Sequence, residues 1–147
     1  MVSEKRYVYA ADPKEKYIPP SSKDPVPFLN FSPLQNAVSE LEKSATEFGE
    51  KLEANSNFAN QNKINELMYK AEQQLLSEGL PRRPWYKHTI YAPGFYTGYG
   101  VKTLPGVREA IEQRNWKEAQ EQIEAVAETI LSYAEQVNSA SKILMMR

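Results

Sequence analysis

Cysteine is absent from the 147-residue sequence, and histidine occurs once, as His88. The absence of cysteine excludes disulfides, thiolate metal ligands and a cysteine nucleophile from these residues. With a single histidine, neither a His-rich zinc site nor a Ser-His-Asp triad is expected. A cation site built only from carboxylates stays open, although no loop has the EF-hand spacing. We therefore expect no metal cofactor and no catalysis from this chain by itself.

An excess of one charge sign is also lacking, because 18 Lys and Arg residues stand against 19 Asp and Glu residues, for a net charge of -1. A dedicated nucleic-acid or membrane-surface protein needs a cationic excess. No apolar run approaches the ~20 residues of a transmembrane helix. We therefore expect neither nucleic acid nor a membrane among the partners of the chain.

Proline is concentrated in residues 1–30, which contain five of the ten prolines and interrupt any helix there. A disordered tail is one interpretation of this segment. Disordered segments, however, usually contain fewer aromatic residues than Tyr7, Tyr9, Tyr17 and Phe28 supply. We favour an extended arm that lies along a surface in polyproline-like conformation, with its aromatic side chains in grooves.

Apolar residues recur with helical spacing after the arm. A first helix is expected over residues 32–54, with Ser32 and Gln35 as a capping box and Pro33 in the first turn. Its apolar stripe has spacings of 4, 3, 4, 3 and 4, which are typical of a helix that packs on other helices. The stripe consists of Leu34, Val38, Leu41, Ala45, Phe48 and Leu52.

Three further helices are expected. One runs over residues 60–78 and stops at Gly79. A short one runs from about 103 to 113. The last runs over 116–138, begins with a capping arrangement of Asn115 and Glu118, and turns a row of glutamates that includes Glu118 to water.

Residues 80–106 have a different composition, rich in aromatic residues, proline and glycine. A helix cannot run through them, and no pair of strands is obvious. We predict a long, ordered and irregular loop, because long loops in compact domains are usually functional. Trp85 is expected to be largely buried against the helices.

These features predict an all-α protein, an antiparallel helical bundle with an ordered aromatic-rich loop and an extended arm. The arm occupies residues 1–30 and the helical domain residues 31–147. The core is thin, so a helix from another segment or subunit is expected to complete it, and the apolar residues 143–146 should also be covered. We expect a homodimer, and the candidates for its interface are Leu34, Val38, Leu41, Ile123 and Ile130.

One tract has a pattern that is specific to a known family. Residues 79–93 read Gly-Leu-Pro-x-Arg-Pro-aromatic-Tyr-x-His-x-Ile-Tyr-Ala-Pro, and Pro-Gly follows at the start of a helix. The tract strongly resembles the C-terminal helical domain of the glutamate carboxypeptidase and transferrin receptor family. Similar flanking helices extend the resemblance to about residues 28–138, and residues 11–20 resemble the bacterial branch of the family.

The resemblance implies that the chain is the C-terminal piece of a longer peptidase. In such enzymes, a large catalytic domain holds two zinc ions with His, Asp and Glu side chains. The helical domain mediates homodimerisation, and its loop reaches the active-site cleft. The partners implied are therefore a second copy of the chain and the catalytic domain of the parent enzyme. A helix that normally precedes the arm is not found in this sequence.

The resemblance also implies that the loop 92–106 forms one wall of the substrate cleft in the intact enzyme. Tyr99 falls on a tyrosine that binds the terminal carboxylate of the substrate in glutamate-selective members, and Gly98 falls where those members have a lysine. Tyr96 is expected in the same wall, whereas Lys102 is near but out of register. The missing cation argues against glutamate selectivity. Packing within the loop is the alternative role of these aromatic side chains.

Other interpretations remain open beside the family resemblance. A free-standing helical interaction module could reuse the fold. His88 is expected to pack and form hydrogen bonds rather than to bind zinc. A short cluster of cationic and aromatic residues would suit single-stranded nucleic acid, although the chain is not basic overall. This cluster consists of Arg82, Arg83, Lys87 and His88 with Trp85 and Tyr86.

Overall fold

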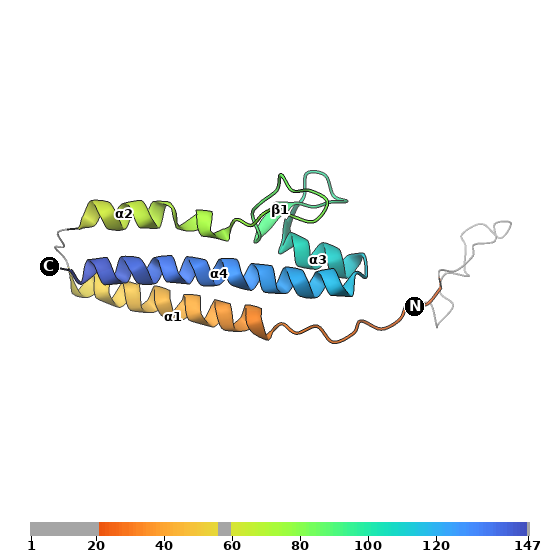
Figure 1. The fold of residues 1–147 in the computed structure, drawn as a ribbon, viewed down its shortest axis with the longest axis horizontal. Coiled ribbons are helices and arrows are strands. Elements are labelled where there is room, and N and C mark those ends of the chain that lie inside the picture. The colour runs from red at the N-terminus through yellow and green to blue at the C-terminus, as the bar shows by residue number, and fades with distance from the viewer. Residues whose placement is uncertain (1–20, 56–59, 147) are drawn as a thin grey trace, which may run out of the picture.

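The computed structural model describes residues 21–55 and 60–146. The described residues form four α-helices, a 3-10 helix and one two-stranded sheet (Figure 1). The predicted helical bundle is therefore confirmed in outline, with the small sheet as an addition. The elements are α1 (Ser32–Ala54), α2 (Gln61–Tyr69), η2 (Ala71–Leu75), β1 (Tyr91–Pro93), β2 (Val101–Thr103), α3 (Pro105–Glu112) and α4 (Trp116–Leu144).

The long helix α4 is the element on which the other helices pack. α1 lies along one side of α4, and α2 and η2 lie along the other (Figure 1). The apolar face of this helix is buried, with Ile123 fully covered and Ile130 only 7% exposed. The helix continues past residue 138 to Leu144, which is buried, whereas Met145 and Met146 remain exposed. No helix within the described residues combines the length and the apolar character needed to cross a membrane.

The predicted antiparallel arrangement is wrong for α1 and α4, which run in the same direction (Figure 1). Just before α1, the backbone N–H of Asn30 donates to Oε1 of Gln120, near the start of α4, at 2.9 Å. Just after α1, Asn55 lies beside Met145, at the end of α4. Residues 60–115 return the chain to the starting end of α1, and α2, η2 and α3 all run antiparallel to α4 (Figure 1).

The contact face of α1 is rotated from the predicted stripe. Its fully buried residues are Ala37 and Ser44, small side chains that allow α1 to approach α4 closely. Val38 and Leu52, which belong to the predicted stripe, are 49% and 39% exposed. About half of the stripe, namely Val38, Ala45 and Leu52, therefore remains accessible to solvent.

The arm is only partly described. Residues 21–30 form neither helix nor strand and are mostly exposed, with Phe28 91% exposed, so this aromatic side chain fills no groove of the chain. Leu29 and Phe31, in contrast, pack against the core. Tyr7, Tyr9 and Tyr17 lie outside the described residues.

One predicted helix cap and one predicted helix boundary are wrong. The predicted bounds of the first helix, 32–54, agree with α1, but Ser32 is the first residue of this helix rather than its cap. Its side chain makes no capping hydrogen bond, and the backbone N–H of Gln35 donates to the carbonyl oxygen of Phe31 at 3.0 Å. The predicted helix over 60–78 is shorter: α2 ends at Tyr69, and η2 gives way to extended backbone at Leu76. Gly79 is needed for a different reason, since its φ is 124° and a Cβ there would lie 2.3 Å from the carbonyl oxygen of Pro84.

The segment 80–106 contains two short strands that the sequence did not reveal. β1 and β2 pair antiparallel, with Ala92 opposite Lys102, and three-residue strands leave too little alternation to recognise. The prediction that Trp85 is buried is wrong, because its side chain is 69% exposed. Its neighbour Tyr86 is half-buried and contacts Arg83 instead.

We expect Ile123→Ala to lower the free energy of unfolding by about 2–5 kcal/mol, because it removes a fully buried side chain from the contact of α4 with α1 and α3. Trp85→Ala is the matched control. It should cost less than about 1 kcal/mol, since the side chain is mostly exposed. Urea unfolding followed by circular dichroism measures both, and a larger loss for Trp85→Ala than for Ile123→Ala would contradict this packing.

Candidate functional site

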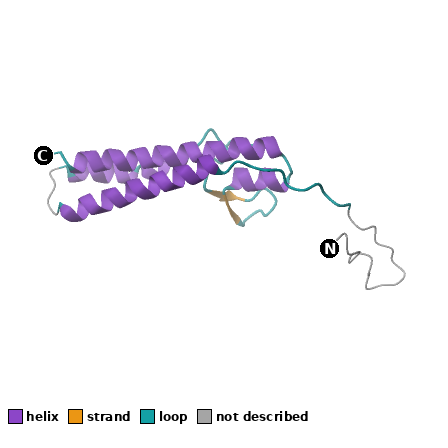
Figure 2. Cartoon of the chain, turned by 90° about the horizontal axis from the view of Figure 1, so that it is seen from below, coloured by secondary structure: helices purple, strands orange, loops and turns teal. Residues whose placement is uncertain are grey.

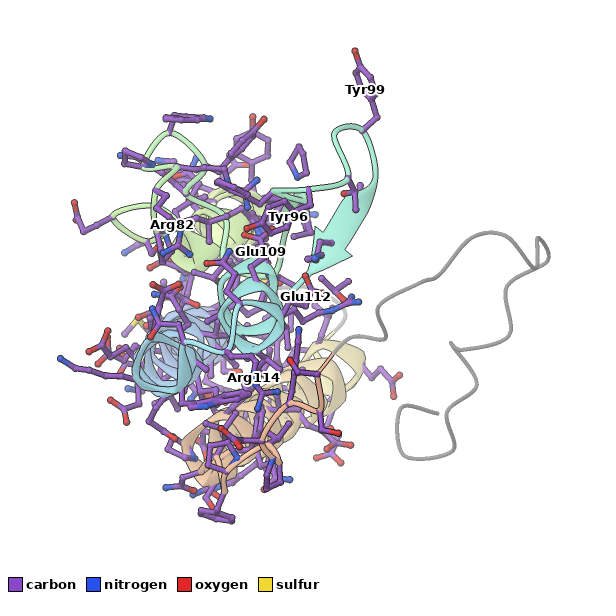
Figure 3. The ribbon with its side chains drawn as sticks, turned by 90° about the vertical axis from the view of Figure 1, so that its right-hand side faces the viewer. Arg82, Tyr96, Tyr99, Glu109, Glu112 and Arg114 are labelled. Atoms are coloured by element: carbon purple, nitrogen blue, oxygen red, sulfur yellow. The ribbon has the colours of Figure 1, made fainter. Side chains whose placement is uncertain are left out.

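The candidate site is a β-ribbon that projects from one end of the bundle. The ribbon consists of β1, β2 and the residues between them, and we call residues 94–100 the aromatic tip. Tyr99 is fully exposed and points away from the bundle, and Tyr96 is 69% exposed (Figure 3). Gly98 has a φ of 63°, in the left-handed region that favours glycine.

A buried ion pair holds the outgoing side of this ribbon. Arg83 Nη2 lies 2.7 Å from Glu109 Oε2, and the two side chains are 7% and 4% exposed. Arg83 Nη1 also donates to the carbonyl oxygen of Pro93 at 2.5 Å, and Glu109 Oε1 accepts the backbone N–H of Phe95 at 2.7 Å. These hydrogen bonds offset the cost of burying both charges. The pair therefore connects the turn at Arg83, the end of β1 and helix α3.

A second ion pair holds the returning side. Lys102, in β2, lies 2.5 Å from Glu112 Oε2, and its side chain is 9% exposed. Glu109 and Glu112 are three residues apart and therefore share one face of α3. The cation that lies nearest in sequence to the aromatic tip is thus engaged within the chain.

Arg82 forms a third ion pair, at the surface of the same end of the bundle. Its guanidinium makes two hydrogen bonds with Glu118, at 2.8 Å and 2.7 Å. The hydrogen bond from Arg82 lowers the pKa of Glu118, and the same bond raises the pKa of Arg82. The prediction that Glu118 faces water is wrong, because its side chain is only 15% exposed. Arg82 and Arg83 are both engaged by carboxylates, so two cations of the cluster that could have bound single-stranded nucleic acid are not available to it.

His88 packs and forms hydrogen bonds, as predicted. Its Nδ1 accepts the backbone N–H of Ile90 at 3.2 Å, and its ring stacks on that of Tyr91 at 4.0 Å. Its Nε2 lies 3.6 Å from Glu72. Tyr91 donates its hydroxyl to the same carboxylate at 2.7 Å, and this hydrogen bond raises the pKa of Tyr91. Within residues 21–55 and 60–146, no three His, Asp or Glu side chains gather closely enough to hold a metal ion.

The interface candidates on the helices lie in two different environments. Ile123 is fully buried within the chain, whereas Ile130 forms part of the floor of a groove of about 590 Å³ between α1 and α2. Leu34 and Leu41 are half-buried, and Val38 is exposed on the same side of α1. We call this surface the apolar groove. Its lining consists of Leu41, Met68, Tyr69, Glu72, Leu75, Ile90, Ile130 and Tyr133.

A second groove, of about 520 Å³, lies between α1 and α4 on the other side of α1. Three glutamates line it beside Ala37, Ala127 and Leu131, so its rim is acidic. We call it the acidic groove. The two grooves differ in charge, and the apolar groove is the better match for the predicted helix-to-helix contact.

Sequence reasoning missed the roles of Glu109 and Glu112. The apolar periodicity of α3 predicts that Val107, Ala110 and Ile111 face inward, and it carries no sign that a carboxylate one turn away is also buried. The only hint lay in the cationic residues of the segment 80–106, since a buried arginine needs an acidic partner. Which carboxylate pairs with Arg83 depends on the three-dimensional path of the loop.

Comparison with known proteins gives a match over most of the chain. Residues 29–138 match the family described as transferrin receptor-like dimerisation domain. A protein from Arabidopsis thaliana described as "Probable glutamate carboxypeptidase LAMP1" is 33% identical over 110 residues, which cover 69% of this chain. A "Probable glutamate carboxypeptidase" from Arthroderma benhamiae is 46% identical over 52 residues, 35% of this chain. The matches span only 16% and 7% of the lengths of these two relatives.

We expect the Arg82–Glu118 pair to stabilise the fold in a pH-dependent way. The pKa of Glu118 is lower in the folded chain than in the unfolded one, so the contribution is present above the unfolded pKa and disappears as the pH falls through the folded pKa. Arg82→Gln should therefore cost less than about 1 kcal/mol at pH 7, since the pair is partly exposed. The difference from the parent chain should vanish in acid, once the pH lies below the folded pKa of Glu118.

Urea unfolding at several pH values tests this expectation. Lys87→Gln is the control, because it removes a cation from an exposed position of the same segment. A deficit of Arg82→Gln that grows as the pH falls would contradict the assignment.

Proposed function

The chain belongs to the family of transferrin receptor-like dimerisation domains, and on this basis we propose that it is the non-catalytic homodimerisation domain of a zinc-dependent exopeptidase. The observation that carries the proposal is the family match over residues 29–138, which includes α1, the ribbon and most of α4. Both relatives named above are described as probable glutamate carboxypeptidases, which supports a carboxypeptidase as the parent protein.

The two zinc ions of such an enzyme have no matching site among residues 21–55 and 60–146, where no three His, Asp or Glu side chains gather closely enough to hold a metal ion. His88 is the single histidine, and its Nδ1 is occupied by backbone N–H groups. The carboxylates of Glu109, Glu112 and Glu118 are each engaged by a cation. The proposed metal centre therefore belongs to another domain of the parent protein, and this chain contributes no step of the hydrolysis.

We further propose that self-association covers the apolar groove. Its walls come from α1 and α2, which pack chiefly on α4 rather than on each other, and Val38 and Tyr69 are 49% and 84% exposed beside it. Exposed apolar surface of this kind is usually buried by a partner. A two-fold arrangement would bring the same face of both copies together and is the commonest solution for a homodimer.

The aromatic tip is proposed to border the substrate cleft of the intact enzyme. Residues 94–101 contain no charged side chain, and Tyr96 and Tyr99 are exposed and available for contact. Lys102 is engaged by Glu112, and the φ of 63° at Gly98 disfavours a lysine there. These features support a cleft wall that is aromatic rather than cationic, and hence a peptidase without selectivity for a C-terminal glutamate.

We expect the purified chain to have twice its single-chain mass of 16.8 kDa in light scattering at micromolar concentration. Val38→Glu should shift the chain toward the monomer, because it introduces a charge beside the apolar groove. Ser39→Glu is the matched control, since it adds the same charge at the next residue, on another face of α1.

The proposal fails if the parent chain remains a monodisperse monomer at high micromolar concentration. A dimer that both variants weaken equally would contradict the apolar groove as the interface, although it would leave self-association in place.

We expect neither peptidase activity nor stoichiometric zinc in the isolated chain, because its sequence contains one histidine and no cysteine to serve as zinc ligands. Elemental analysis after extensive dialysis measures the metal content, and hydrolysis of a set of dipeptides measures the activity. Two tightly held zinc ions per chain would contradict this assignment.

A further inference from the structure

The aromatic tip makes few contacts of its own with the bundle. Its hydrogen bonds are largely internal, from Gly94 N–H to the carbonyl oxygen of Gly100 at 2.9 Å and from the Thr97 hydroxyl to the same oxygen at 3.1 Å. Tyr99 is fully exposed. The position of the tip must therefore be determined by the residues that fasten the two strands below it.

Both strands are fastened to one helix. The outgoing strand is held by Glu109, which accepts the Phe95 N–H and binds Arg83, whose guanidinium in turn binds the carbonyl oxygen of Pro93. The returning strand is held by Glu112, which binds Lys102. Figure 3 shows Glu109 and Glu112 on α3, between the body of the bundle and the ribbon that carries Tyr96 and Tyr99.

The attachment of the outgoing strand is also enclosed by aromatic side chains. The guanidinium carbon of Arg83 lies 5.3 Å from the ring centroids of both Tyr86 and Phe95. These contacts are cation–π interactions, and the low exposure of Arg83 strengthens them. Phe95 is the second residue of the tip, so the ion pair fixes both its backbone and its ring.

α3 itself has a fixed position on the bundle. Val107 and Ala110 are 2% and 0% exposed in the core, and a Cβ on Gly106 would lie 2.1 Å from the side-chain oxygen of Gln122. The helix therefore sits close against α4. The two carboxylates of α3, Glu109 and Glu112, therefore connect both strands of the ribbon to a helix whose position is fixed.

We propose that Glu109 and Glu112 are positioning residues that hold the aromatic tip in one orientation relative to the bundle. This inference rests on the proposed function, in which the tip contacts the substrate cleft of the parent enzyme. It deepens that function, because it couples the orientation of the cleft wall to the helices that form the dimer. The carboxylates act through Phe95 and Lys102, and they touch no substrate themselves.

Hydrogen–deuterium exchange on the 147-residue chain tests the proposal. In Glu109→Gln and in Glu112→Gln, the hydrogen-bonded amides within residues 94–101, such as those of Gly94, Phe95 and Gly100, should exchange roughly tenfold faster or more, because local opening of the ribbon becomes easier. Amides in the middle of α4 should keep their parent rate. Glu118→Gln is the matched control, since it breaks the Arg82 ion pair at the same end of the bundle and leaves the ribbon attached.

The exchange pattern separates positioning from a general loss of stability. Equal acceleration in the ribbon and in α4 would overturn the proposal, because it would mean that the ion pairs support only the global fold. Unchanged exchange in residues 94–101 in both variants would overturn it as well. If Glu109→Gln does not fold, the exchange of Glu112→Gln alone tests the proposal. Glu112 is 45% exposed, so its substitution leaves the core intact.

Rescue and an independent measurement complete the test. The double variant Lys102→Glu with Glu112→Lys restores the ion pair with reversed charges and should return the exchange of residues 94–101 to within about threefold of the parent rate. No rescue would count against the pairing as the cause. Light scattering on the same samples reports dimerisation separately, so a failed proposed function and a failed positioning role give different results.

Discussion

Every other helix of the described residues packs on α4, and the positions of the remaining elements follow from this packing. α1 covers one side of α4, α2 and η2 cover another, and α3 packs near its start. Each large apolar side chain that α4 buries contributes roughly 1.5–3 kcal/mol, and Ile123 and Val126 are almost completely covered. α1 and α2 both pack mainly on α4, so the apolar groove between them stays open. The long helices lie side by side in Figure 2.

Polar contacts then determine where the ribbon lies. Burying Arg83 and Glu109 costs free energy, and the pair persists because Pro93 and Phe95 supply further hydrogen bonds to both side chains. An apolar pair of similar volume could fill the same space, but it would not select one register of the ribbon on α3. The ribbon and the bundle are thus parts of one assembly, in which the helices that form the proposed dimer interface also support the proposed cleft wall.

The sequence predicted the features that depend on local chemistry. Asn115 caps α4 because its side chain accepts the Glu118 N–H, and apolar periodicity located all four helices. The sequence-based predictions failed where a feature depends on contacts between segments that are distant in the sequence. The parallel direction of α1 depends on the path of residues 55–115, and the rotated face of α1 depends on how closely Ala37 lets it approach α4. Trp85 is exposed because Arg83 and Tyr86 occupy the interior of the turn instead, which no local pattern announces.

A dilution series of two-dimensional NMR spectra on the labelled chain tests whether the chain associates through its apolar groove, as we propose. We expect the resonances of Val38, Leu41 and Tyr133 to shift or broaden as the concentration rises through the micromolar range, while those of Ile123 stay unchanged. Concentration-dependent shifts confined to Leu131 and the acidic groove, or spectra that do not change with concentration, would contradict it.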